Sequence, residues 1–169
     1  MGISVNLSPK QFHQPCLVDD VAEVLQETGL AACNLTLEGT ESVVVQDSGF
    51  AETTLEKLRN LGVSIDIDDF RTGYSSFDRL KCLPINTLKI DRSFVARLGE
   101  DPRDEHIIQA IIKVAYGLGL GVVAEGVEAS EQATRLRALG CEMAQGYYFS
   151  KPLPSEAIDT LLTSQLASD

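Results

Sequence analysis

Six short runs with β-strand character alternate with amphipathic helical segments along the chain of 169 residues. The expected strands occupy residues 3–7, 35–39, 63–69, 87–91, 121–127 and 143–149. Helical patterns fill the intervals and follow the last strand, at 17–28, 50–60, 75–82, 104–117, 130–138 and 155–166. Such alternation is typical of parallel strands joined by right-handed crossovers. Because no linker or low-complexity segment interrupts it, we predict a single α/β domain over residues 1–169.

Charge restricts the partners of such a domain. The chain has 14 basic and 25 acidic residues and a net charge of -11, which argues against polymeric nucleic acid or an anionic membrane as a partner. An anionic substrate would need bound cations. The longest apolar stretch contains Gln109 and Lys113 and is broken by glycines, so it predicts no membrane span. The N-terminus lacks a signal-peptide pattern and the four cysteines lack C-x-x-C spacing, so we expect a cytoplasmic protein with free thiols.

Polar residues stand near the end of all six expected strands, inside otherwise apolar runs. They are Asn6, Glu38, Asp68 with Asp69, Lys89 with Asp91, Glu125 and Gln145. A doubly wound sheet collects its ligand at one switch point, whereas a (β/α) barrel collects functional groups from the carboxyl ends of many strands. The pattern therefore favours a parallel (β/α) TIM-type barrel. The alternative for any single residue is that it caps the following helix.

The chemistry of this polar ring suits divalent cations. Carboxylate and amide oxygens without histidine or thiolate partners are ligands for Mg²⁺ or Mn²⁺, and the adjacent Asp68 and Asp69 could bridge two ions. Two such ions activate water and stabilise the attacking and leaving oxygens of a phosphodiester. Lys89 would then steer the attacking water or neutralise charge on the phosphoryl group. The alternative is that Lys89 only pairs with Asp91 at the strand end.

A third aspartate in the same run, Asp66, has no assigned role. Period-two alternation places it on the same side of the strand as Asp68. A carboxylate at this position is either solvated or has a raised pKa, and the sequence leaves the choice open.

Six segments in order carry a resemblance to a known family. They are SVNLS, LEGTES, DDFRTGYSS, LPINTLKIDRSFV, VVAEGVE and AQGYYFSKPLP, and they run from residue 3 to about residue 156. These segments resemble the successive motifs of the EAL-domain family of bacterial cyclic di-GMP phosphodiesterases. The resemblance implies a (β/α)₈ barrel that opens cyclic di-GMP, a bacterial second messenger, to the linear dinucleotide pGpG with two Mg²⁺ or Mn²⁺ ions.

The resemblance also implies a role for each polar residue. The implied metal ligands are Asn6, Glu38, Asp68, Asp69 and Glu125. Lys89, Glu125 and Asp68 would carry the catalysis, with Lys89 positioning the attacking water. Gln145 and Asp91 would support the metal-site network, and Glu41 would brace the loop after Asp69. The family usually depends on dimerisation through the region around this loop. Arg71, in the same loop, is not part of the family pattern, but its charge could hold a phosphate of the substrate.

The chain departs from the family pattern in ways that predict impaired turnover. It begins at the family's third strand, so the first two βα units are missing, with the Glu-Ala-Leu motif that supplies another metal ligand. We therefore expect about six of eight βα units, weakened metal binding, and a homo-oligomer that covers open edges at Ile3 and Met143. Arg71 stands in place of a family glycine, and Asp66 in place of a small apolar residue.

Two functions remain open at this point. The first is a cyclic di-GMP phosphodiesterase module, whole or as a fragment of a longer enzyme with sensory or GGDEF-type domains. The second is a degenerate module that binds cyclic di-GMP or a protein partner without turnover. A different metal-dependent barrel enzyme would leave the order of the six motifs unexplained.

Overall fold

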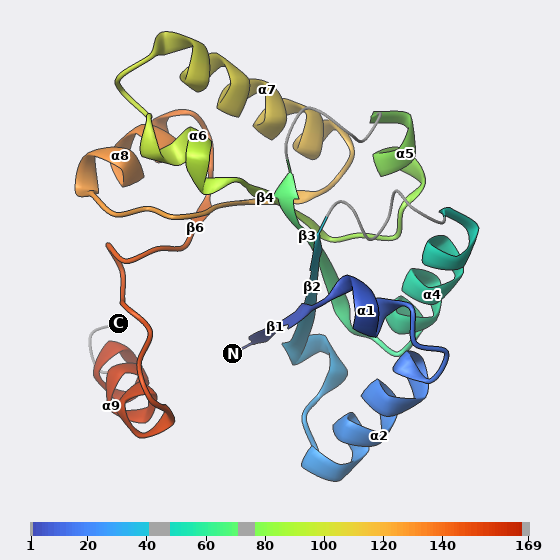
Figure 1. Cartoon of the computed structure of the whole chain (residues 1–169). Helices are drawn as coiled ribbons and strands as arrows, with labels where there is room; N and C mark the ends of the chain where they lie inside the picture. Colours follow the sequence, from blue (N-terminus) through green and yellow to red (C-terminus); the bar gives the residue numbers. More distant parts are fainter. Residues whose placement is uncertain (1, 41–47, 71–76, 167–169) are drawn as a thin grey trace.

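The computed structural model describes residues 2–40, 48–70 and 77–166 and contains one curled sheet with helices on its outer side (Figure 1). The strands of this sheet are β1 (Ile3–Leu7), β2 (Leu35–Thr40), β3 (Ser64–Phe70), β4 (Thr87–Ile90), β5 (Gly121–Ala124) and β6 (Met143–Ala144). The helices are α1 (Pro9–Phe12), α2 (Leu17–Thr28), the 3₁₀ helix η1 (Ala32–Asn34), α4 (Ser48–Asn60), α5 (Phe77–Cys82), α6 (Arg92–Ala96), α7 (Pro102–Gly117), α8 (Ser130–Ala138) and α9 (Ser155–Leu166).

All strand pairs of the sheet are parallel, and each strand lies beside its neighbours in sequence. The order is β1-β2-β3-β4-β5-β6, so no reversal creates the switch point of a doubly wound sheet. The six strands curl into a half-barrel with β1 and β6 at its two edges (Figure 1). The predicted incomplete (β/α) barrel is therefore confirmed.

The hydrophobic core lies between the convex side of the sheet and the helices. Alternate residues of the central strands face it, among them Ile67, Leu88 and Ile90, and they share one buried cluster with Leu58 of α4 and Ile108 of α7. Burying each such side chain contributes roughly 1.5–3 kcal/mol. The residues between them in sequence face the inside of the half-barrel, because side chains alternate along a strand. This alternation separates an apolar outer face from a polar inner face.

The last two strands end earlier than the pattern predicts. β5 ends at Ala124 and β6 at Ala144, so Glu125 and Gln145 lie in the loops that follow and not inside the strands. Gly126 accounts for the first difference, since its φ of 67° is a left-handed conformation that ends an extended strand. The two loops still stay together, because the Gln145 N–H donates to the Ala124 carbonyl at 2.8 Å.

Two short helices, α1 and α6, were not predicted from periodicity. Ser8 caps α1, since its hydroxyl accepts from the Gln11 N–H at 3.3 Å. Asp91 caps α6, since its carboxylate accepts from the Ser93 N–H at 2.7 Å. Helices of four and five residues are too short to show a 3.6-residue period, and side-chain caps account for their stability.

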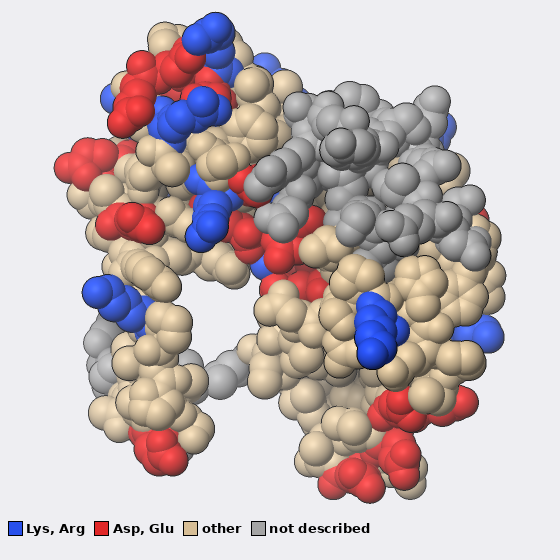
Figure 2. Space-filling model, viewed as in Figure 1, with Lys and Arg blue, Asp and Glu red and all other residues tan. Residues whose placement is uncertain are grey.

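The open side of the half-barrel exposes apolar side chains. Ile3 of β1 is 54% exposed and Met143 of β6 is 48% exposed. Helix α9 stands apart at the end of an extended segment, and the space-filling view leaves an opening between it and the body of the domain (Figure 2). The two edge strands are thus left without a covering layer in the part of the chain that the structure describes.

Two features concern the chain as a whole. All four cysteines are free thiols in the structure. Within the described ranges, no helix is both long and apolar enough to cross a lipid bilayer.

Candidate active site

Four charged side chains meet at the carboxyl ends of β2, β3, β4 and β5. Lys89 Nζ lies 2.6 Å from Glu38 Oε2, 2.5 Å from Glu125 Oε1 and 3.8 Å from Asp68 Oδ1. We call these four residues the Lys89 cluster. Lys89 and Glu38 are 51 residues apart in sequence. They meet because the carboxyl ends of neighbouring parallel strands lie at one edge of the sheet.

The Lys89 cluster is largely shielded from solvent. The exposed fractions of the side chains are 2% for Lys89, 9% for Glu38 and 14% for Glu125. One ammonium among three carboxylates leaves an excess of negative charge in this buried place. Such an excess attracts a further cation.

Burial and ion pairing shift the pKa values of Lys89 and Glu125 in opposite directions. Burial lowers the pKa of Lys89, but hydrogen bonds to Glu125 and Glu38 outweigh it and hold that pKa above its usual 10.5. Burial raises the pKa of Glu125 to about 7 against the effect of Lys89, and the Asp68 carboxylate adds to the rise. Lys89 therefore stays charged at neutral pH, while Glu125 takes up a proton near neutrality when only Lys89 neutralises it.

One residue of β1 and one residue just after β6 extend the polar region around the Lys89 cluster. Gln145, in the loop after β6, donates from Nε2 to Glu125 Oε1 at 3.0 Å. Asn6 of β1 is exposed and stands opposite Glu38 in the register of the β1–β2 pair. Polar residues predicted from strands at both ends of the sheet are therefore brought to one side of the half-barrel.

Other predicted residues lie outside this group. Glu41 and Arg71 fall outside the described residues, and for Asp69 only the backbone, at the end of β3, is described. Asp91 is buried and caps α6. Because Lys89 forms ion pairs with carboxylates of β2, β3 and the loop after β5, the alternative in which Lys89 pairs only with Asp91 is wrong.

Asp66 lies on the inner face of β3, two residues before Asp68. It is 9% exposed, and burial raises its pKa; a hydrogen bond from the Thr87 side chain lowers that pKa, and the Glu38 carboxylate raises it. Of the two alternatives left by the sequence, solvation or a raised pKa, the structure supports the raised pKa.

The donor chemistry of this region fits Mg²⁺ or Mn²⁺. Glu38, Asp68 and Glu125 supply carboxylate oxygens, which hard divalent cations prefer, and the ammonium that they surround is itself a cation. In the described ranges, no three acidic, histidine or cysteine side chains form a ready-made metal site. The described carboxylates are instead engaged with Lys89.

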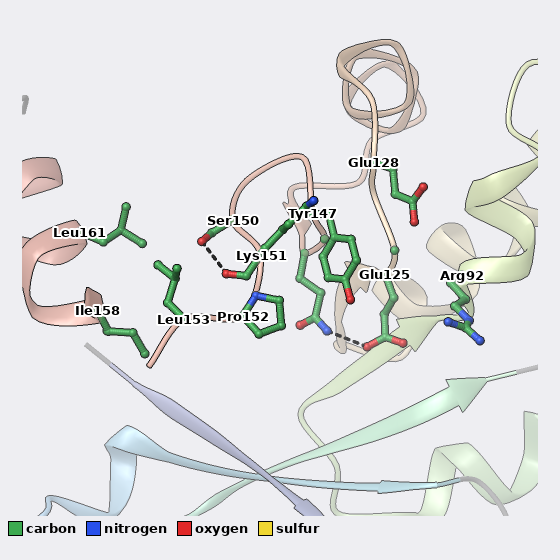
Figure 3. Close-up of a pocket in the computed structure, with 13 residues that line it drawn as sticks. Arg92, Glu125, Glu128, Tyr147, Ser150, Lys151, Pro152, Leu153, Ile158 and Leu161 are labelled. Atoms are coloured by element: carbon green, nitrogen blue, oxygen red, sulfur yellow. Dashed lines mark hydrogen bonds between the residues drawn. The ribbon is translucent and has the colours of Figure 1, made fainter. Parts of the chain in front are cut away.

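A cavity of about 630 Å³ opens beside the Lys89 cluster, and Glu125 and Gln145 line it (Figure 3). Its walls come from the segments after β4, β5 and β6 and from α9. Sequence reasoning missed the other lining residues, which include Arg92, Glu128, Tyr147, Lys151, Pro152 and Ile158. The signal that could have found the first five is their position just after a strand, inside motifs already noted.

Comparison with known proteins agrees with this geometry. The family model described as "EAL domain" matches residues 1–152. Cyclic di-GMP phosphodiesterase NbdA of Pseudomonas aeruginosa is 47% identical over 162 residues, which are 96% of this chain and 21% of NbdA. The solved c-di-GMP complex of the MucR phosphodiesterase, from the same organism, matches with a TM-score of 0.89 and 44% identity over 93% of this chain and 64% of that chain.

A further solved relative contains a metal ion. The manganese/cy-diGMP complex of Klebsiella pneumoniae BlrP1 matches with a TM-score of 0.82 and 30% identity over 89% of this chain and 39% of that chain. The chain spans about a fifth of the length of the curated relatives, 21% of NbdA and 23% of MucR. Since the family model covers most of the chain and the half-barrel superposes on solved EAL structures, the chain belongs to the EAL domain family.

Proposed function

We propose that this chain is the phosphodiesterase unit of an EAL-type protein and that it opens cyclic di-GMP to pGpG. The observation that carries the proposal is the buried Lys89 cluster beside a cavity of about 630 Å³, within the size range of small-molecule sites. Relatives that carry the name cyclic di-GMP phosphodiesterase support it. A longer parent protein with sensory or GGDEF-type domains is part of the same proposal.

We assign two divalent cations, Mg²⁺ or Mn²⁺, to this site. The residues that would hold them are Asn6, Glu38, Asp68, Asp69 and Glu125. Bound there, such ions supply activation of water and stabilisation of the charge that develops on a phosphodiester. The oxygen-only donor set supports this assignment.

Lys89 acts on the substrate directly in this proposal. An ammonium has three N–H donors, and Glu38 and Glu125 accept two of them. Asp68 Oδ1 lies 3.8 Å from the same nitrogen, and we assign the third donor, which has no hydrogen-bond partner among the described residues, to an oxygen of the attacking water or of the phosphate. Gln145 holds the Glu125 carboxylate through its 3.0 Å hydrogen bond and so limits how far that carboxylate can turn.

The remaining predicted residues bind the substrate or hold the backbone around the site in place. We assign Arg71 to a phosphate of the substrate and Glu41 to bracing the loop after β3. Asp91 acts through the backbone, because its cap on α6 holds the segment that follows Lys89.

We expect the isolated chain to turn over slowly. The half-barrel is open between β1 and β6, and the proposed ligand Asn6 is exposed at that edge. Misplacing a reacting group by about 1 Å costs roughly 10²-fold in rate. The same openness favours the second candidate, a module that binds cyclic di-GMP or a protein without turnover.

Chromatographic detection of pGpG separates these candidates. The purified chain is incubated with cyclic di-GMP and Mn²⁺ beside Lys89→Ala, which sets the background, and binding is measured in parallel by calorimetry. Slow turnover that is lost in Lys89→Ala is the expected result. Binding with no pGpG above background would favour the module without turnover. Absence of both binding and turnover in the wild type would refute the proposed function.

A further inference from the structure

Arg92 is a cation that lies close to the Lys89 cluster but is not part of it. It is one of the residues that line the same cavity as Glu125, and it is exposed to solvent (Figure 3). The other charged side chains around the cavity are Glu128 and Lys151. Among the described residues, neither Arg92 nor Lys151 forms an ion pair within 4 Å. The cavity therefore presents two cationic side chains, Arg92 and Lys151, that form no ion pair with another described residue.

The backbone fixes where the Arg92 side chain begins. Arg92 directly follows Asp91, which is 1% exposed and is held by its hydrogen bond to the Ser93 N–H. On the other side, a Cβ built on Gly126 would lie 2.6 Å from the Arg92 Cβ, so the loop after β5 packs directly against Arg92. The first atoms of the Arg92 side chain are thus held in place at the wall of the cavity, at a short distance along the chain from Lys89.

An arginine in this place matches the chemistry of a phosphate. A guanidinium binds a phosphate through two parallel N–H···O bonds, and it keeps its charge at all physiological pH values. The chain as a whole has a net charge of -11, so binding of a dianionic ligand depends on local cationic groups such as this one. A cyclic dinucleotide has two phosphodiesters in one ring. When one lies at the Lys89 cluster, the other must lie elsewhere in the adjoining cavity.

We propose that Arg92 binds the phosphate of the cyclic dinucleotide that is not cleaved. This inference rests on the proposed function, because it takes the Lys89 cluster as the place of the cleaved phosphate. Arg92 forms no ion pair with Glu125 within 4 Å in the described part of the chain, which sets it apart from that cluster. Arg92 then selects a ligand with a second phosphate and orients the ring across the cavity.

The experiment measures the dissociation constant of cyclic di-GMP by calorimetry, with Mg²⁺, for the full chain and three variants. Arg92→Ala removes the charge, Arg92→Lys keeps the charge without the guanidinium plane, and Arg137→Ala removes an exposed arginine of α8 that does not line the cavity. We expect about tenfold weaker binding for Arg92→Ala, at most about threefold for Arg92→Lys, and no change for Arg137→Ala. Raising the salt concentration should weaken the wild type more than Arg92→Ala.

Three other outcomes would contradict the role of Arg92, the phosphate contact or the proposed function itself. Equal dissociation constants for the wild type and Arg92→Ala would overturn the role of Arg92 and leave the proposed function standing. An equal loss in Arg92→Ala and Arg92→Lys, with the salt dependence of the wild type retained in both, would overturn the phosphate contact, because a phosphate is bound through charge, whereas bidentate binding to a neutral guanine edge is not. No binding of cyclic di-GMP by the wild type would overturn both this inference and the proposed function.

Discussion

Replacing Lys89 by methionine tests whether the Lys89 cluster is held together by charge. Methionine has a similar length and fills a similar volume, so the change removes the ammonium with little loss of packing. It leaves Glu38 and Glu125, with side-chain exposures of 9% and 14%, without the cation that lies within 2.6 Å of both. Removing one partner of a buried ion pair costs about 3–5 kcal/mol. We expect the lower end of this range, because Glu125 can take up a proton.

The pH dependence of this loss follows from the pKa of Glu125. Its pKa in the folded chain is raised to about 7 from 4.5, so its contribution to stability is full below 4.5 and is lost as the pH rises through about 7. Without Lys89 nothing in the cluster opposes the effect of burial, so the folded pKa of Glu125 rises further. The difference in stability between Lys89→Met and the wild type should therefore be small at pH 5 and large at pH 8.

Thermal unfolding followed by circular dichroism measures this loss. The wild type, Lys89→Met and Lys113→Met, a matched change of an exposed lysine on α7, are compared at pH 5 and pH 8 in EDTA. A loss of about 3 kcal/mol lowers the Tm of a chain of this size by about 6–12 °C, and Lys113→Met should leave it unchanged. Mn²⁺ should restore part of the loss, since it also neutralises the carboxylates. A decrease of equal size at both pH values would refute the electrostatic reasoning.

Three further predictions follow from the same structure. Asp68→Asn should bind Mg²⁺ or Mn²⁺ more weakly than the wild type in calorimetry, because it removes a carboxylate beside Glu38 and Glu125; equal affinities would contradict the ligand assignment. Sedimentation at micromolar concentration should show a dimer or larger species that covers the edges at Ile3 and Met143, and a clean monomer would argue against edge pairing. Asp66→Asn should raise the Tm at pH 7, because burial raises the pKa of Asp66 and its charged form therefore destabilises the fold. Below about pH 4 the carboxyl is protonated in both the folded and the unfolded chain, so the difference in Tm should disappear. An equal Tm at pH 7 would show that the Asp66 carboxylate is solvated in solution.

The alternating pattern of apolar runs was enough to predict parallel strands joined by helices, because each strand needs only a local preference for extended backbone and an apolar outer face. The polar residues near all six strand ends favoured a barrel over a doubly wound sheet, and the family resemblance indicated that the barrel is incomplete; the sequential strand order agrees with both. The same reasoning predicted that Glu38, Asp68 and Lys89 would converge, because residues at the carboxyl ends of parallel strands meet at one edge of the sheet.

The ends of β5 and β6 could not be predicted in the same way. A period-two pattern continues through Glu125 and Gln145, but the left-handed backbone of Gly126 ends β5, and a sequence pattern does not reveal which conformation a glycine adopts. The short helix α6 was hidden for a related reason, since five residues give too little periodicity and the cap from Asp91 acts through one hydrogen bond.

Only the tertiary structure decided which charges pair and where a ligand fits. Asp91 is two residues from Lys89, yet Lys89 pairs with Glu38, which is 51 residues away, and with Glu125. The cavity that includes Arg92 likewise arises from segments after three strands and from α9. Local sequence sets the backbone preference and the face of each residue. The register and curl of the sheet set the distances between those faces, and these depend on contacts among all six strands at once.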